Sequence, residues 1–521
     1  MSSPTLSSSR RAFLRRAGLG SSAALLAQLP SVAFSQPGRA PSHPTPPASS
    51  DPTDDLVFMS TLKIASLIRT KKISAKEAVT ACYARIDEVN PRLNAVVQFC
   101  RERALQEAAA ADAALASGKS LGPLHGVPMC IKDSWDTAGV ISTGGTQGRA
   151  FFVPEKDATC VARLRAAGAI LLGKTNTPEF TLGGVTGMGT TVNIIYGMSR
   201  NPYDPTRSTA GSTGGGGAIV AAGGAFFDIG TDFGGSIRGP AHANGIAGLK
   251  PTSGRVPRTG HIVDFGGVFD AYQQGGPLAR KVEDLDFLTA LIAGPDAKDA
   301  AIKPMPWPDY KTVDVSKLRV AFYKSMAPDS TKPTKEMAEL VQATASHFES
   351  LGCKVEESFP PGAMEAAEIS TKIREGDGNA WQKRLTEKYK TTVPGPNRRF
   401  DYPLIATAEY TELLEKLDAW RSGMIGWVKN YDLILCPPSL GPAPVIGDRS
   451  NEGGARRGAG FTSTYNLAGY PSGVVRCGTS PEKMPLGIMC TAQPWREDIV
   501  LAAMSSLETK FGGWDPKGLK I

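Results

Sequence analysis

Two glycine-rich segments, each carrying a serine, constrain this chain more than any other feature. The first runs from Arg207 through Ser212 into four consecutive glycines, and the second is Gly230-Thr231-Asp232-Phe233-Gly234-Gly235-Ser236-Ile237-Arg238. Glycine accepts backbone conformations that other residues avoid and lets the main chain approach a ligand closely. An alanine-rich, helix-like stretch separates the two segments. The pattern predicts two tight loops that present Ser212 and Ser236 from a folded scaffold.

The chemistry available to such serines depends on a base. A serine hydroxyl is a poor nucleophile unless a neighbouring group removes its proton during attack. Lys132 follows the apolar run Val127–Ile131, which favours a buried lysine, and burial lowers the pKa of an amine. We therefore expect Lys132 to act as the base, Ser236 as the nucleophile and Ser212 as a proton relay between them.

The glycine pair before Ser236 suggests a site for a developing negative charge. Backbone N–H groups that converge on an oxyanion stabilise the transition state of acyl transfer. The predicted donors are the amides of Phe233, Gly234, Gly235 and Ser236. Asp232 and Arg238 are expected to orient this loop by ion pairing and not to react.

Each residue also has a structural interpretation. Ser236 could cap a helix, Ser212 could be an ordinary loop serine, and Lys132 could be a half-buried ion-pair partner of Asp133. The presence of all three residue types together favours the catalytic interpretation.

Several further motifs accompany the serines. They are Gly173-Lys174-Thr175-Asn176-Thr177-Pro178-Glu179-Phe180, Gly248-Leu249-Lys250-Pro251-Thr252, Gly276-Pro277-Leu278-Ala279-Arg280 and the stretch from Phe461 to Pro471. With these motifs the chain resembles the amidase signature family over nearly its whole body. The resemblance implies a Ser-cisSer-Lys triad of Ser236, Ser212 and Lys132, with a cis peptide at Ser212, a supporting role for Gly211 and an acyl-enzyme intermediate.

The chain also departs from the usual pattern of that family. Thr213 stands where a second serine is common, Ala210 replaces a frequent glycine, and Gly216-Gly217 replaces a small polar pair. None of these changes removes a catalytic group, but they alter the glycine loop.

Hydrophobic periodicity predicts an α/β protein. Helical spacing covers Leu62–Val89 with a capping box at Ser74 and Glu77, and helices are also expected for Arg101–Ser117, Ala158–Ala167 and Lys335–Leu351. Short apolar strands are expected at 126–133, 169–172 and 318–322. This alternation indicates one large domain over residues 54–521, with a mixed sheet flanked by helices on both faces.

The N-terminus is typical of a targeting segment. Arg10-Arg11 is followed by a modestly apolar stretch from Ala17 to Leu29 and by the small-x-small sequence Ala33-Phe34-Ser35. This resembles a twin-arginine export signal over residues 1–35, with cleavage near Ser35 and a periplasmic or secreted product. The stretch is too short and too rich in Gly, Ser and Ala for a stable membrane span. Residues 36–53, rich in proline, are expected to form a tether.

Other classes of function are disfavoured. The formal charge of +8 includes four arginines of the predicted export signal. Basic residues elsewhere are interspersed with acidic ones, so the sequence does not indicate nucleic-acid binding. No His or Cys cluster has metal-ligand spacing, and we expect no cofactor and no metal. The eight cysteines show no framework spacing, which leaves their pairing open.

Two catalytic motifs fit poorly. Gly168 to Thr175 matches a phosphate-loop pattern, but its intervening residues are apolar and strand-like. A Ser-His-Asp hydrolase needs a nucleophile elbow that neither serine segment provides. Among the five histidines, His242 is close to Ser236 in sequence, although a structural role is favoured for it.

The sequence therefore predicts an exported hydrolase of small amides. A carbamate or ester hydrolase is the main alternative, since the same acyl-enzyme chemistry serves all three substrates. A non-catalytic binding protein and a component of an amidotransferase are less favoured. The sequence leaves open whether the protein forms a homodimer. Four aromatic residues in the region before residue 403 are candidates to bound the acyl group or to be ordinary packing: Trp381, Tyr389, Phe400 and Tyr402.

Overall fold

The computed structural model describes residues 47–51, 53, 55–182, 190–263, 267, 272–327, 330–395, 398, 400–447 and 459–521. All of them lie in one compact unit, Pro44–Ile521. The predicted export signal of residues 1–35 and most of the predicted tether lie outside the described residues.

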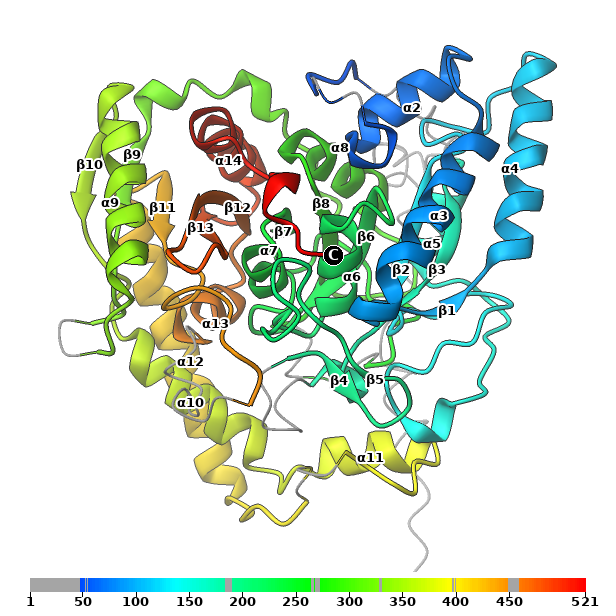
Figure 1. Ribbon diagram of the computed structural model, residues 1–521. Coiled ribbons are helices and arrows are strands. Elements are labelled where there is room, and N and C mark those ends of the chain that lie inside the picture. The colour runs from blue at the N-terminus through cyan, green and yellow to red at the C-terminus, as the bar shows by residue number, and fades with distance from the viewer. Residues whose placement is uncertain are drawn as a thin grey trace, which may run out of the picture. The chain divides into compact units, whose positions relative to one another are not determined.

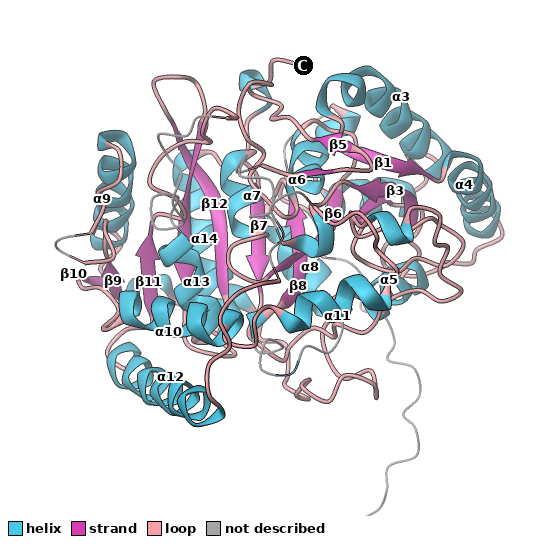
Figure 2. Cartoon of the chain, turned by 90° about the horizontal axis from the view of Figure 1, so that it is seen from below, coloured by secondary structure: helices cyan, strands magenta, loops and turns pink. Residues whose placement is uncertain are grey.

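An eleven-stranded mixed sheet forms the centre of this unit (Figures 1 and 2). Its strands, in spatial order, are β1 (Val96–Phe99), β3 (Ile170–Thr175), β2 (Pro128–Lys132), β6 (Phe227–Asp232), β8 (Gln274–Ala279), β7 (Ala247–Lys250), β12 (Ser472–Thr479), β13 (Pro485–Thr491), β11 (Leu433–Cys436), β9 (Arg319–Phe322) and β10 (Lys354–Glu357). Strand β2 pairs in parallel with both β3 and β6, whereas β6 and β8 are antiparallel. The predicted mixed α/β fold is confirmed.

Helices surround the sheet. They are α2 (Thr61–Arg69), α3 (Ala75–Leu93), α4 (Arg101–Ala116), α5 (Thr159–Ala166), α6 (Gly214–Ala221), α7 (Arg238–Ala243), α8 (Val282–Ile292), α9 (Lys335–Ser350), α10 (Ala363–Glu375), α11 (Ala380–Lys388), α12 (Thr407–Val428), α13 (Ala459–Leu467) and α14 (Glu497–Phe511). In Figure 1, α10, α11 and α12 gather along the lower side, away from α8 and α14.

Glycines in the strands let helices pack on both faces of the sheet. A Cβ on Gly473 would meet side chains of α14, whereas a Cβ on Gly248 would meet Ile237 and Ala241 at α7. Gly248 pairs with Val474, the residue after Gly473, and successive strand residues point to opposite faces. Helices α7 and α14 therefore cover opposite faces of the sheet.

The predicted helix boundaries agree closely with the structure. Ser74 caps α3 in a complete capping box with Glu77. Helix α4 ends one residue before Ser117, and Gly118 follows with a φ of +80°. Strand β3 runs on through Lys174 and Thr175, so this segment has the extended conformation of a strand and not that of a phosphate-binding loop.

The ordered contacts begin before the predicted start of the domain at residue 54. Ser49 Oγ and Ser50 N–H both donate to the carboxylate of Glu283. Asp51 is buried and accepts the Ser60 N–H. The last residues of the expected tether are thus part of the folded unit, because their polar groups pair with it.

All eight cysteines are buried and unpaired. None of the helices among the described residues is long and apolar enough to cross a bilayer. Within the same residues, no three side chains of His, Cys, Asp or Glu are grouped so that they could hold a metal ion.

Arg280 joins segments that are distant in the sequence. Its guanidinium is buried and donates to the carbonyls of Met59, Val220 and Ala225 at 2.7–2.8 Å. It also lies over the rings of Phe226 and Trp514. Arg280 therefore joins three parts of the chain: the segment before α2, helix α6 and the segment before β6.

We expect Arg280→Met to lower the free energy of unfolding by about 3 kcal/mol, because it leaves several buried carbonyls without donors. Urea unfolding measures this change. Arg319→Met is the control, since Arg319 pairs with Asp432 at the surface with 44% of its side chain exposed and such pairs contribute about 0–1 kcal/mol. Equal losses in the two variants would contradict the role of Arg280.

Candidate active site

Lys132 ends strand β2 with its side chain completely buried. Its ammonium nitrogen donates to Ser212 Oγ at 2.6 Å, Thr231 Oγ1 at 2.9 Å and Thr213 Oγ1 at 3.1 Å. Asp133 is not its partner, because that carboxylate accepts from Thr143 instead. The structure therefore brings Lys132 and Ser212 together, and the interpretation of Lys132 as an ion-pair partner of Asp133 is wrong.

The surroundings of Lys132 alter its proton affinity. Burial lowers its pKa to about 7, against the opposing negative charges of Asp228 and Asp232. An amine with this pKa is substantially neutral at physiological pH, and only the neutral form can accept a proton. Lys132 can therefore act as a base, as the apolar residues before it in the sequence predict.

Ser212 lies in a tight loop just before α6. The Gly211–Ser212 peptide bond is cis, as the family resemblance implied, and Ala210 has a φ of +56°. Ser212 is buried, and the N–H of the next residue, Thr213, donates to the carbonyl of Ser236 at 3.2 Å. This backbone bond holds the two serine loops against each other.

Ser236 lies in the turn between β6 and α7 and is half-buried. Gly235 before it has a φ of +126°, and a Cβ there would lie 2.6 Å from Thr462 Oγ1. The Thr462 hydroxyl donates to the carbonyl of Gly234 at 2.6 Å. Only glycine fits this position, because the backbone conformation and the contact with α13 both exclude a side chain.

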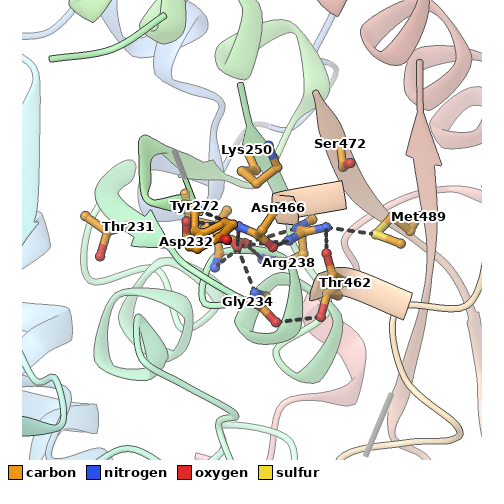
Figure 3. Close-up of polar contacts among 12 residues, drawn as sticks. Thr231, Asp232, Gly234, Arg238, Lys250, Tyr272, Thr462, Asn466, Ser472 and Met489 are labelled. Carbon is orange, nitrogen blue, oxygen red and sulfur yellow. Dashed lines mark hydrogen bonds and ion pairs between the residues drawn. The ribbon is translucent and has the colours of Figure 1, made fainter. Parts of the chain in front are cut away.

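Asp232 and Arg238 organise the serine loop, as expected, through a completely buried ion pair (Figure 3). The Asp232 carboxylate also accepts the N–H groups of Gly235 and Ile237 at 2.8 and 3.0 Å. Burial would raise the pKa of Asp232, but the charge and hydrogen bonds of Arg238, together with Asn466, hold it well below the usual value.

This network extends to helix α13. Arg238 Nη1 donates to the carbonyl of Thr462 at 2.8 Å, and Asn466 Nδ2 donates to Asp232 Oδ1 at 3.0 Å and to the carbonyl of Tyr272 at 2.9 Å (Figure 3). Helix α13 therefore fixes the loop from more than 200 residues away in the sequence.

One predicted oxyanion donor is engaged elsewhere. The N–H of Gly235 donates to Asp232 Oδ1, so in this conformation that amide serves the carboxylate and differs from our expectation. The amides of Phe233, Gly234 and Ser236 stay predicted donors.

The histidine nearest to Ser236 in sequence has a structural role. His242 lies between the carbonyl of Gly441, 2.9 Å from Nε2, and the N–H of Gly487, 2.9 Å from Nδ1. Burial lowers its pKa to about 4. Both ring nitrogens are occupied by backbone groups, which agrees with the structural role favoured from the sequence.

Several groups at the site were not predicted from the sequence. Thr213 was known only as a departure from the family pattern, and no role was expected for Thr231 or Asp228. The signal was present in the second serine segment, where Thr231 precedes Asp232 at the end of a strand next to the one that carries Lys132.

A second apolar cluster borders the serine loop. Phe233 packs at its edge and meets Tyr272 edge-to-face with ring centroids 5.7 Å apart. The cluster includes Trp381, and Tyr389 packs against it; both are among the four aromatic residues named from the sequence. Glu179 holds the segment that follows α11, because its carboxylate accepts hydrogen bonds from the Gly395 N–H and from Arg398.

Comparison with known proteins gives a consistent result. The family model described as Amidase matches residues 77–501. The A subunit of the glutamyl-tRNA(Gln) amidotransferase of Moorella thermoacetica is 34% identical, covering 87% of this chain and 97% of that protein. Indoleacetamide hydrolase of Bradyrhizobium diazoefficiens is 32% identical, covering 87% of this chain and 86% of that protein.

A solved structure of 6-aminohexanoate cyclic dimer hydrolase in complex with its substrate has the same fold. It superposes with a TM-score of 0.78 at 26% identity and covers 88% of this chain and 98% of that one. Because the family model spans most of the sequence and the fold agrees, this chain belongs to the amidase signature family.

Proposed function

We propose that this protein is a serine hydrolase that cleaves carbon–nitrogen acyl bonds with Ser236, Ser212 and Lys132. The observation that carries the proposal is the 2.6 Å contact between Lys132 Nζ and Ser212 Oγ. Ser212 is in turn held against the Ser236 loop by the Thr213 N–H. Nucleophilic catalysis by Ser236 requires that its proton reach a base, and we propose that Ser212 passes it to the buried amine of Lys132.

The proposed reaction has two stages. Ser236 Oγ attacks the acyl carbon while its proton passes to Ser212 and the Ser212 proton passes to Lys132. The proton then returns through Ser212 to the leaving nitrogen, and an acyl-enzyme stays on Ser236. Water then attacks this ester while its proton passes through Ser212 to Lys132, and the proton returns through Ser212 to Ser236 Oγ as the ester bond breaks and the carboxylic acid leaves.

The substrate class is proposed as small amides, with carbamates and esters as the main alternative. Leaving-group protonation separates them, since an amine is a poor leaving group without a proton. Trp381 and Tyr389 pack in the cluster that borders Phe233, which supports an apolar or aryl acyl group. We further propose, from the Arg10-Arg11 segment, that the protein acts outside the cytoplasm.

A second candidate function is that of one component of an amidotransferase. It is favoured by the 34% identity to the Moorella thermoacetica protein over 97% of that protein. Such a component would act with further subunits on a charged tRNA, as the name of that relative indicates. The proposed export signal disfavours this alternative, because a tRNA substrate is cytoplasmic.

Hydrolysis of a panel tests the proposal. The panel contains acyl anilides, primary amides including glutamine, carbamates and nitrophenyl esters, and it is run on the protein and on Ser236→Ala. We expect turnover of amides to fall by at least about 10³-fold in Ser236→Ala. Covalent capture, with mass spectrometry of the labelled peptide, identifies the nucleophile. Glutamine as the only substrate turned over would favour the amidotransferase alternative, and unchanged turnover in Ser236→Ala would exclude the proposed nucleophile.

Lys132→Ala should impair amide hydrolysis more than ester hydrolysis. General acid–base catalysis contributes about 10²–10⁴-fold, and an amine leaving group depends on the relayed proton more than an alkoxide or phenolate does. The measurement is the ratio of kcat/KM for a matched anilide and nitrophenyl ester in both proteins. An equal loss on the two substrates would contradict the relay from Lys132.

Activity should fall as the pH decreases below about 7. The pKa of Lys132 is lowered to about 7 by burial, and the amine is the active form, so protonation removes the base. The profile of kcat/KM against pH reports this group in the free enzyme. An acid limb near pH 4, where carboxylates titrate, would show that another group limits the reaction.

A further inference from the structure

Asp228 is a buried carboxylate close to Lys132. It lies on β6 directly beside Cys130 of β2 in the parallel ladder, and Lys132 follows two residues later on the same face of the sheet. Asp228 is completely buried. Its Oδ2 accepts the Thr175 hydroxyl at 2.9 Å, whereas its Oδ1 has no hydrogen-bond partner among the described residues.

Helix α6 leaves room for this carboxylate. A Cβ on Gly216 would lie 2.5 Å from Asp228 Oδ1, so glycine is required there while the carboxylate keeps its place. Gly216 is one of the residues at which the chain departs from its family's usual pattern. The same helix begins directly after Ser212 and Thr213. The carboxylate therefore lies between its own strand β6, which neighbours β2, and helix α6, which begins just after the relay serine.

The other charged side chains near Lys132 already have ion-pair or hydrogen-bond partners. Asp232 is paired with Arg238. Lys174, on β3 at the other side of β2 from β6, donates to Thr137 Oγ1 and Ser142 Oγ. Two further titratable groups nearby, His261 and Cys130, are uncharged, because burial lowers the pKa of His261 to about 3 and raises that of the Cys130 thiol.

Asp228 differs from these groups. Within the described part of the chain, no Lys or Arg side chain lies within ion-pair distance of its carboxylate, and Lys132 and Lys174 are the cations whose charge acts on it. Burial raises the pKa of Asp228 to about 7, although the Thr175 hydrogen bond and those two lysines oppose the shift. A proton on Lys132 therefore favours the ionised form of Asp228, and the ionised carboxylate favours the proton on Lys132.

We propose that Asp228 is a positioning residue of this site, whose carboxylate stabilises the ammonium form of Lys132 when the Ser236 proton arrives. This inference rests on the proposed function, because it concerns the step in which Lys132 acts as a base. Ser236 Oγ loses its proton to Ser212 as it bonds to the acyl carbon, and Ser212 loses its own proton to Lys132. The positive charge that develops on Nζ is then stabilised by a nearby negative charge that is also buried.

The test measures the reactivity of Ser236 without a substrate. A fluorophosphonate labels an activated serine when Ser Oγ bonds to phosphorus and fluoride leaves. The labelling rate is followed from pH 5 to 9 in the full chain and in Asp228→Asn. We expect the acid limb to move to lower pH by about one unit, because a neutral amide no longer favours the ammonium form. The plateau rate should also fall.

Asp286→Asn is the matched control. Asp286 is a partly buried aspartate that accepts from Trp307 Nε1 at 2.8 Å, with its pKa raised by burial to about 6. It is not among the residues whose charge acts on Lys132. The acid limb of the labelling profile of Asp286→Asn should coincide with that of the unaltered protein.

The outcomes separate the two proposals. Absence of Ser236 labelling in the unaltered protein would overturn the proposed function. Normal labelling with an unshifted limb in folded Asp228→Asn, checked by thermal unfolding, would overturn the role of Asp228 alone. If Asp228→Asn does not fold, Thr175→Val replaces it. That change removes the hydrogen bond to Asp228 and favours its neutral form, so the limb should move in the same direction, and an unshifted limb would again overturn the role.

Discussion

The burial of the Lys132 amine is the constraint on which the rest of the site depends. A charged amine without water is costly unless donors and acceptors replace its hydration. Here three hydroxyl oxygens surround the nitrogen, from Ser212, Thr213 and Thr231. They satisfy the ammonium without fixing its charge, as a directly bonded carboxylate would. The amine can therefore gain and lose a proton, while the hydroxyl of Ser212 stays in contact in both states.

The two serine loops need different kinds of support. The Ser212 loop is short and is held by its own helix and by Lys132. The Ser236 loop would otherwise expose several N–H groups at its turn, and the Asp232 carboxylate binds two of them. That carboxylate is in turn neutralised by Arg238, which α13 secures through Thr462. A buried ion pair is a weak source of stability, and its value here is that it fixes one conformation of the turn.

Much of this could be predicted from sequence because the controlling features are local. Glycines at 234 and 235, the capping box at Ser74 and the apolar run before Lys132 each determine a conformation or a burial within a few residues. The three residues proposed to be catalytic could be named for the same reason, although only the structure places Lys132 against Ser212. Long-range contacts account for what the sequence did not predict. Nothing near Gly235 in the sequence shows that its N–H donates to Asp232, and nothing near Asp228 shows that its charge acts on Lys132. The pairing of β2 with β6 brings together residues almost 100 positions apart, and such register is set by tertiary packing.

The structure also separates the surroundings of Lys132 from the second apolar cluster. Lys132, Ser212 and Asp228 are held by strands β2 and β6 and by helix α6, whereas the second apolar cluster is built largely from α10, α11 and α12. The contact between the two parts passes through Phe233 and Tyr272, and through Glu179, which binds the segment after α11. Substitutions in α10 to α12 can therefore change the surroundings of an acyl group while the amine and its hydroxyl partners keep their geometry.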